Sequence, residues 1–579
     1  MLQFVRKENW PESVQGDNRV IVRAIEPVPE AFDVDLPVPC GCSLFPRFRC
    51  GQVSEWACKV KTLALGSVKS MSGQTLQWYA GICIEALILY QKKIASIQAM
   101  KSSKKQLSSI SAKIHTPEAG YYAFVAFFII LFFTGGGARD DILSLVLLRP
   151  LAVLFCAYAL TVRAPEQWKG RMFPLCIIGA LLSLMVLQLI CLPPSVWTAL
   201  PGHQIFADIA DIAGIEQPWR PLTLSPSRTL NSLLSLAVPI AAIMLYLNLD
   251  WKYRRRAVVT IIVLCAISAL WAIFQLAGTG RGPLYTYRIT NLGTGVGLFA
   301  NRNHQAIMLA SAIAMFGWYA GSLKPNVKQA MLKYYASLAT ILVFVPLIFV
   351  TGSRAGLLLM GPALILALFF IYFGSYNDDR AQGRNRPVRR KTSRISGRKL
   401  ILAAGVGTIV AIAVASVVLS RSEAFDRLLG VSDVEELRVQ LLPTFFTMLT
   451  DFFPWGSGFG SFEYVYKIYE PQDLLSPSYL NQAHNDWLQF PMEGGVPALL
   501  IVICALFWFA LRLYALAKNW RTNDPEKYRA LMCAAVISFF LAASIGDYPL
   551  RVPSIMAICS VLVCLLDDSI RTIQRRVAK

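Results

Sequence analysis

Charged side chains are scarce in this sequence. Only 16% of its 579 residues are Asp, Glu, Lys or Arg, and 55% are hydrophobic, whereas soluble domains carry about 25% charged residues. This scarcity excludes an ordinary soluble protein. The hydrophobic residues form long runs rather than an alternating pattern, and long runs are typical of helices that cross a bilayer. The composition therefore predicts an all-α, polytopic membrane protein.

Several catalytic motifs are also missing. The sequence has no H-E-x-x-H motif and no cluster of His, Cys and carboxylate residues in its outer loops, so catalytic zinc is not expected. It has no G-x-S-x-G nucleophile elbow. The glycine strings at 293–297 and 456–460 do not match G-x-G-x-x-G after a strand, and they predict turns rather than nucleotide loops. We expect no metal and no cofactor.

Residues 1–118 contain no apolar run of spanning length, and no signal-peptide core follows the N-terminus. Cys40, Cys42, Cys50 and Cys58 lack the C-x2-C spacing of common zinc sites, which favours solvated thiols over a metal. We expect residues 1–118 to be a cytoplasmic segment of low order, or a start of the reading frame that is not native.

From Gly120 onward, apolar runs follow one another, each close to the ~20 residues that a bilayer requires. Twelve runs are predicted to span, at about 120–134, 142–162, 173–193, 230–249, 257–277, 303–320, 336–352, 354–373, 400–419, 496–516, 530–546 and 552–566.

Loop charge predicts the orientation of these helices. Lys and Arg cluster in alternate loops, which the positive-inside rule assigns to the cytoplasm together with both termini. The net charge of +21 therefore does not indicate a nucleic-acid partner. Its most basic stretch, the run at 380–399, is explained by a solvated loop that faces lipid headgroups. Residues 420–495 are acidic and belong outside. The predicted organisation is a segment at 1–118, helices 1–9 at 119–419, a long periplasmic loop at 420–495, and helices 10–12 with a basic tail at 496–579.

The outer loop 420–495 ends in HNDWLQ, which places His484 beside Asn485 and Asp486, near the start of a helix. A neutral imidazole can accept a proton from a hydroxyl group as that group attacks. His304 in FANRNHQA lies on the same predicted side. Its position favours either a local hydrogen bond at a helix start or a role in the site, and the sequence does not choose between them.

Arginines gather on this outer face, although the positive-inside bias should exclude them. They are Arg228, Arg281, Arg288, Arg302, Arg354 and Arg551. Any one of them could extend towards lipid headgroups. As a set, with small residues that let backbone N–H groups approach an anion, they favour phosphate binding. The pattern predicts a diphosphate site beside a general base.

Along the chain, Arg228 before a helix is followed by FANRNHQA, TGSRAG, a long loop with GSGFGSF, then HNDWLQFPMEGGVP and DYPLRVPS. This order of motifs resembles the O-antigen ligase and O-antigen polymerase family of bacterial envelope polysaccharide enzymes, over roughly residues 120–570. The ligase pattern of His, then Asn, Ser or Gln, then nine residues and Gly is met by His484, Asn485 and Gly495. Ala498 stands where the family often has Gly.

The resemblance implies a metal-independent glycosyltransferase in the bacterial inner membrane. Such an enzyme moves a glycan from undecaprenyl diphosphate, at the periplasmic face, to an acceptor hydroxyl of lipid A–core or of a growing polysaccharide. His484 would act as the general base or orient the acceptor. Arg228 and Arg354, with Arg281 or Arg302, would hold the diphosphate, and His304, Asn485 and Arg551 are further candidates for substrate contacts.

Two other classes of protein stay open at this stage. A polysaccharide flippase or other transporter should place ionisable residues mid-membrane and often shows an internal repeat. Here few charges interrupt the apolar runs, Arg149 being one, and no repeat is visible. A structural subunit without catalysis would tolerate changes at His484. Ligase and polymerase share these motifs, and the long loop with the extra N-terminal segment favours an exopolysaccharide or capsule polymerase.

Overall fold

The structure is a computed structural model of the chain, and it describes residues 116–162, 168, 171–323, 328–374, 439–475 and 480–578. Four predicted features lie outside these residues: almost all of the segment 1–118 with its four cysteines, the basic run 380–399, the predicted span 400–419 and the first part of the loop 420–495.

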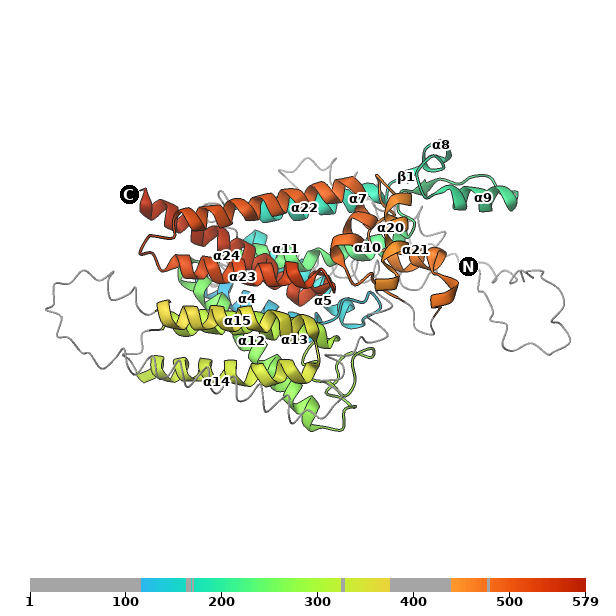
Figure 1. Cartoon of the computed structure of the whole chain (residues 1–579). Helices are drawn as coiled ribbons and strands as arrows, with labels where there is room; N and C mark the ends of the chain where they lie inside the picture. Colours follow the sequence, from blue (N-terminus) through green and yellow to red (C-terminus); the bar gives the residue numbers. More distant parts are fainter. Residues whose placement is uncertain are drawn as a thin grey trace, which may run out of the picture. The chain divides into compact units, whose positions relative to one another are not determined.

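The described residues are mostly helical (Figure 1). The longer helices are α4 (Pro117–Thr134), α5 (Ser144–Thr161), α7 (Phe173–Gln188), α10 (Pro226–Ser235), α11 (Ala237–Leu247), α12 (Trp251–Ala277), α13 (Arg302–Gly321), α14 (Lys328–Thr351), α15 (Arg354–Gly374), α20 (Leu442–Asp451), α22 (Asp486–Lys518), α23 (Glu526–Ala543) and α24 (Pro553–Val577). Short elements complete the described chain: α8 (Pro194–Trp197), α9 (Gln204–Ile212), α21 (Phe462–Tyr469), the 3-10 turns η5 (Gln472–Leu474) and η6 (Pro549–Arg551), and the antiparallel strands β1 (Cys191–Leu192) and β2 (Arg220–Pro221).

Eight helical segments in the described residues are long and apolar enough to cross a membrane, counting α10 and α11 as one segment. The other segments are α4, α5, α12, α14, α15, α22 and α24. Three more predicted spans coincide with helices: α7 is shorter, α13 begins with polar residues, and α23 carries charges in its first turn. The chain is therefore a multi-pass helical membrane protein, and the predicted number of twelve spans stays a prediction.

Helix α13 lies inside the bundle, because every residue from His304 to Trp318 is buried. It packs closely on α15 through small residues. A Cβ placed on Gly356 would lie 2.4 Å from the Cβ of Ala306, and one on Gly317 would lie 2.3 Å from the backbone of Ala367. Such close approach is typical of helix pairs in membranes, where small residues let two backbones meet.

The predicted loop 420–495 contains helices where it is described. Helices α20 and α21 lie at one end of the long helices (Figure 1), and their apolar faces share a buried cluster with Ala483 and Met492. Helix α22 begins at Asp486, not at the predicted boundary of 496. It bends at Gly495, whose backbone has φ 62° and ψ −157°. Helices α20 and α21 were not predicted, because a short helix with only one apolar face does not contain a run of spanning length.

Candidate functional site

His484 occupies the turn that leads into α22. It is the one non-glycine residue with positive φ (52°) in the described part of the chain, and such a conformation at a non-glycine residue often marks a functional site. The side chain of Asn485 caps the helix by accepting a hydrogen bond from the N–H of Leu488 at 3.2 Å. The N–H of Asp486 donates to the carbonyl oxygen of Ser544 at 3.0 Å. The turn is thus held on both sides.

Asp547, in the turn between α23 and η6, faces the imidazole of His484. Its Oδ1 lies 3.3 Å from Nδ1 of His484 and accepts the N–H of Tyr548 at 3.0 Å. Burial opposes ionisation of Asp547, which is 1% exposed, but the neighbouring His304 and His484 outweigh it and hold its pKa well below the usual range. An ionised carboxylate at Nδ1 favours the tautomer with the proton on that nitrogen, so Nε2 is the basic atom of His484.

His304 approaches the same carboxylate from α13. Its Nε2 lies 3.7 Å from Oδ1 of Asp547, and its side chain is 2% exposed. Both imidazole rings pack against the ring of Tyr548, with centroids 5.3 Å away for His304 and 4.9 Å for His484. The structure thus brings the two histidines together on one carboxylate, with His304 in the interior.

Arg551 is held by two carboxylates of α22. Its Nε donates to Oδ1 of Asp486 at 2.7 Å, and its Nη1 donates to Oε2 of Glu493 at 3.3 Å. Glu493 is fully buried, and its other oxygen accepts from the amide of Gln489 at 2.9 Å. Burial opposes the charge of the guanidinium, yet Glu493 and Asp486 outweigh it and raise the pKa of Arg551. This network ties η6 to the helix that follows His484.

Arg228, at the start of α10, is likewise held by carboxylates from distant segments. It pairs with Asp140 and with Glu463 of α21, the second contact being 3.3 Å. The same guanidinium donates to the hydroxyl of Tyr464 at 3.1 Å. The structure therefore joins the loop after α4, helix α10 and helix α21 at one arginine.

One cavity of about 500 Å³ is lined by Arg228, Arg551 and Asp486. Its polar end is lined by four arginines and three carboxylates: Arg139, Arg149, Arg228, Arg551, Asp140, Glu463 and Asp486. The rest of the lining is mostly apolar and comes from α7, α11, α22 and α24, with side chains such as Ile178, Leu506 and Met556. A charged end that continues into an apolar channel between helices fits a molecule with a polar head and a hydrocarbon tail.

The remaining predicted residues lie elsewhere. Arg281 is exposed in the segment between α12 and α13. Arg302 and Arg354 begin α13 and α15, and Nη1 of Arg302 lies 3.8 Å from where a Cβ on Gly352 would stand, in the turn before Arg354. None of these three residues lines the 500 Å³ cavity, and neither His304 nor His484 does; Gln482 and Asp486, on either side of His484, do.

Several residues of the site were not predicted from the sequence: Arg149, Asp547 and three carboxylates that hold arginines, namely Asp140, Glu463 and Glu493. Arg149 of α5 is buried, lines the cavity and donates to the side-chain oxygen of Asn231 at 2.6 Å. Its signal was present, since an arginine inside an apolar run is a functional candidate by default. The sequence around Asp547, an aspartate before Tyr-Pro, does not distinguish it from an aspartate in a surface turn. In the described part of the chain, no group of three or more His, Cys, Asp or Glu side chains could hold a metal ion.

Comparison with known proteins bears on residues that contribute to this site. Residues 338–503 match the family model described as O-antigen ligase. The matched range includes the second half of α14, all of α15, α20 and α21, His484 and the first half of α22. No curated protein matches the chain. Residues 338–503 are therefore similar to the O-antigen ligase family, and over these residues the match confirms the resemblance that the motifs predicted.

Proposed function

We propose that the protein transfers a glycan from undecaprenyl diphosphate to an acceptor hydroxyl at the periplasmic face of the inner membrane. One observation carries this proposal: a histidine oriented by a buried carboxylate stands beside a cavity with an arginine-rich end and a long apolar body. The apolar body suits a polyprenyl chain, and the arginines suit a diphosphate.

The reaction follows from these positions. The acceptor oxygen attacks the anomeric carbon of the glycan and loses its proton to Nε2 of His484. The bond between that carbon and the diphosphate oxygen breaks, and undecaprenyl diphosphate leaves with the electron pair. Asp547 stabilises the imidazolium that forms. General base catalysis of this kind contributes roughly 10²- to 10⁴-fold to a rate.

The carboxylates around the arginines orient the guanidinium groups before substrate binds. Arg228 and Arg551 each use only some of their five N–H donors on Asp140, Glu463, Asp486 and Glu493. The other donors can reach phosphate oxygens. Arg149 adds a buried cation to the lining of the cavity. Negative charge that builds on the leaving diphosphate is thereby stabilised by groups already in place.

The test is the transfer of glycan from lipid-linked donor in membranes that contain His484→Ala, Arg228→Ala or Arg551→Lys. We expect a loss of at least about 100-fold for His484→Ala. Arg220→Ala serves as a control, because this arginine packs on Trp197 away from the cavity. Wild-type transfer by His484→Ala at a normal protein level would overturn the proposal.

The lipid-linked product that accumulates in cells separates the remaining alternatives. Single repeats on lipid indicate a polymerase, and full-length polymer on lipid indicates a ligase. Lipid-linked glycan that stays on the cytoplasmic leaflet, inaccessible to an added glycosidase, would instead support the flippase.

A further inference from the structure

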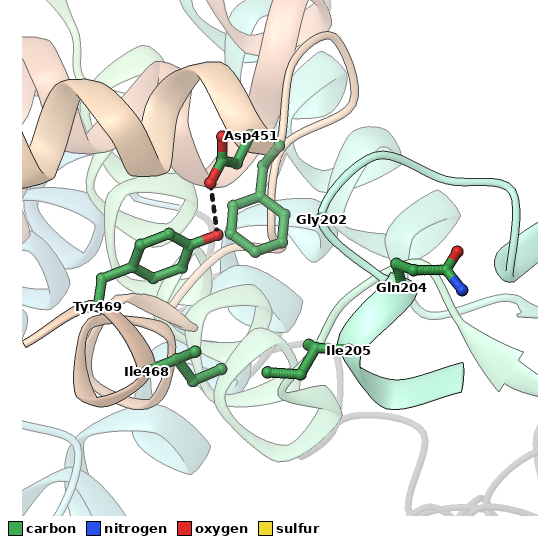
Figure 2. Close-up of a pocket in the computed structure, with 7 residues that line it drawn as sticks. Gly202, Gln204, Ile205, Asp451, Ile468 and Tyr469 are labelled. Atoms are coloured by element: carbon green, nitrogen blue, oxygen red, sulfur yellow. Dashed lines mark hydrogen bonds between the residues drawn. The ribbon is translucent and has the colours of Figure 1, made fainter. Parts of the chain in front are cut away.

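A second pocket, of about 380 Å³, lies outside the cavity that holds Arg228 and Arg551. Its walls come from the start of α9 with the residue Gly202 before it, from the end of α20 and from the end of α21 (Figure 2). The lining residues are Gly202, Gln204, Ile205, Asp451, Phe452, Ile468 and Tyr469. The volume lies in the range of small-molecule sites, and nothing in the transfer reaction uses these residues.

The pocket is preformed. The hydroxyl of Tyr469 donates to Oδ2 of Asp451 at 2.9 Å and fixes the carboxylate (Figure 2). Gly202 has φ 75°, and a Cβ on it would stand 2.3 Å from the ring of Phe452, so this position requires glycine. Phe452 is 2% exposed and belongs to the same buried cluster as Ala483, the residue before His484. The pocket therefore rests on the apolar core that also supports the turn of His484.

The lining alternates polar groups with apolar ones. Asp451, Tyr469 and Gln204 offer a carboxylate, a phenol and an amide, while Ile205 and Ile468 are about half exposed and face one another across the opening (Figure 2). Sugars present the same alternation, with hydroxyl groups at their edges and C–H groups on their faces. Among the described lining residues there is no Lys or Arg, and the carboxylate would repel an anion. The chemistry thus favours a sugar without a phosphate or acidic group.

Helix α21 links this pocket to the cavity. Glu463 lines the polar end of the cavity beside Arg228, and Tyr469 lines the pocket. Tyr469 follows Glu463 by six positions along this α-helix, a rise of about 9 Å. A short oligosaccharide whose first sugar lies at the diphosphate can cover that distance.

We propose that this pocket is a glycan-binding subsite, which holds neutral sugar units remote from the bond that reacts. The inference rests on the proposed transferase function, because only a glycan substrate would bring sugars to this position. The glycan could belong to the lipid-linked donor or to the acceptor, and both present the same hydroxyl chemistry to Asp451 and Tyr469.

The test uses Asp451→Asn and Tyr469→Phe in the full chain, purified in detergent. The probe is the oligosaccharide released by mild acid from the lipid-linked glycan of the host cells, and binding is followed by saturation-transfer NMR. Each variant is expected to weaken probe binding by about 3- to 10-fold, the range for one lost hydrogen bond. Asp473→Asn is the matched control, since Asp473 is an exposed carboxylate of η5 outside the pocket.

Transfer kinetics then identify the source of the glycan. A higher KM for the lipid-linked donor, with kcat unchanged, assigns the pocket to the donor, and a higher KM for the acceptor assigns it to the acceptor. Unchanged probe binding and unchanged KM values in both pocket variants would overturn the subsite. Failure of the transferase proposal looks different, because His484→Ala would then transfer glycan normally whatever the pocket variants do.

Discussion

At the scale of single residues, the structure concentrates its chemistry on Asp547. This carboxylate is buried, and its pKa is held well below the usual value of an aspartate. Its Oδ1 lies 3.3 Å from Nδ1 of His484 and 3.7 Å from Nε2 of His304. A buried carboxylate that orients an imidazole fixes its tautomer and stabilises its charged form, as in hydrolase triads. The basicity of His484 therefore depends on a residue 63 positions away.

Replacing Asp547 with asparagine tests this dependence. The amide keeps the shape of the side chain but loses its charge and can face His484 with either an oxygen or an N–H group. We expect glycan transfer to fall by at least about 100-fold, with the protein level within about twofold of wild type. The rate is measured in membranes with matched amounts of protein. A rate close to wild type would show that Asp547 does not act through His484.

Arg551 makes a different prediction, because its partner Glu493 is fully buried. Arg551→Met would leave that carboxylate without its cation, and breaking a buried pair costs roughly 3–5 kcal/mol. We expect a clear drop in the thermal unfolding midpoint in detergent. Adding Glu493→Gln removes the fully buried one of the two charges left unpaired, the other being Asp486, and should recover part of the lost stability without restoring transfer. Equal stability of wild type and Arg551→Met would contradict the pairing.

Which site residues could be predicted depends on where their signal lies in the sequence. His484, Asn485 and Gly495 belong to one short motif, so their local pattern was sufficient. The partner of His484 comes from a separate turn, and no local feature of DYPLRVPS distinguishes Asp547 from a solvated aspartate. The carboxylates that hold Arg228 come from α21 and from the loop after α4. Such contacts are set by the packing of helices, which a single sequence does not specify.

At the scale of elements, the bend in α22 explains why the motif contains Gly495. A residue with φ 62° and ψ −157° lies in a region that is essentially restricted to glycine. The bend also admits the backbone of 454–458: the N–H of Val496 donates to the carbonyl oxygen of Pro454, and the N–H of Gly458 donates to that of Glu493, both at 2.8 Å. The glycine string at 456–460 and the pair Gly494 and Gly495 are thus parts of one junction, on the helix that His484 precedes.

Gly495→Ala should damage this junction. Its Cβ would stand 2.2 Å from the carbonyl oxygen of Pro454, and the strained backbone alone costs roughly 1–3 kcal/mol. We expect lower thermal stability together with loss of transfer. Gly361→Ala in α15 is the matched control, because a Cβ there meets nothing within 4 Å and alanine favours a helix. If both variants behaved alike, the bend would not depend on glycine.

The elements themselves were predictable to different degrees. Long apolar helices that face lipid, such as α12 and α15, follow directly from hydropathy. Helix α13 is buried on all sides from His304 to Trp318, so its polar start faces protein and the usual lipid signal weakens. Helices α20 and α21 bury only one face against the cluster that contains Ala483. A helix that packs one face against protein needs only a few apolar residues on that face, whereas a helix in lipid needs a long apolar run.

At the scale of the whole molecule, ionic groups gather at both ends of the helices for different reasons. At the end opposite His484, Asp567 and Asp568 of α24 are buried and pair with arginines from other helices, among them Arg254 of α12 at 2.5 Å and Arg512 of α22 at 3.2 Å. These pairs connect α12, α22 and α24 within the predicted cytoplasmic side. The carboxylates there are matched by cations, whereas the cavity end has one more arginine than carboxylates among its lining residues.

The orientation inferred from loop charge can be tested across α22. Asp473 precedes this helix and Asn523 follows it, and both are exposed. The 33 residues of the helix rise about 50 Å, more than the ~30 Å hydrocarbon core, so the two positions should face opposite compartments. In a background without native cysteines, Asp473→Cys should react with a membrane-impermeant maleimide in intact spheroplasts, and Asn523→Cys only after lysis. The reverse result would place His484 and the arginine-lined cavity on the cytoplasmic side. Arginines are expected on that side by the positive-inside rule, so their presence would no longer support a diphosphate site.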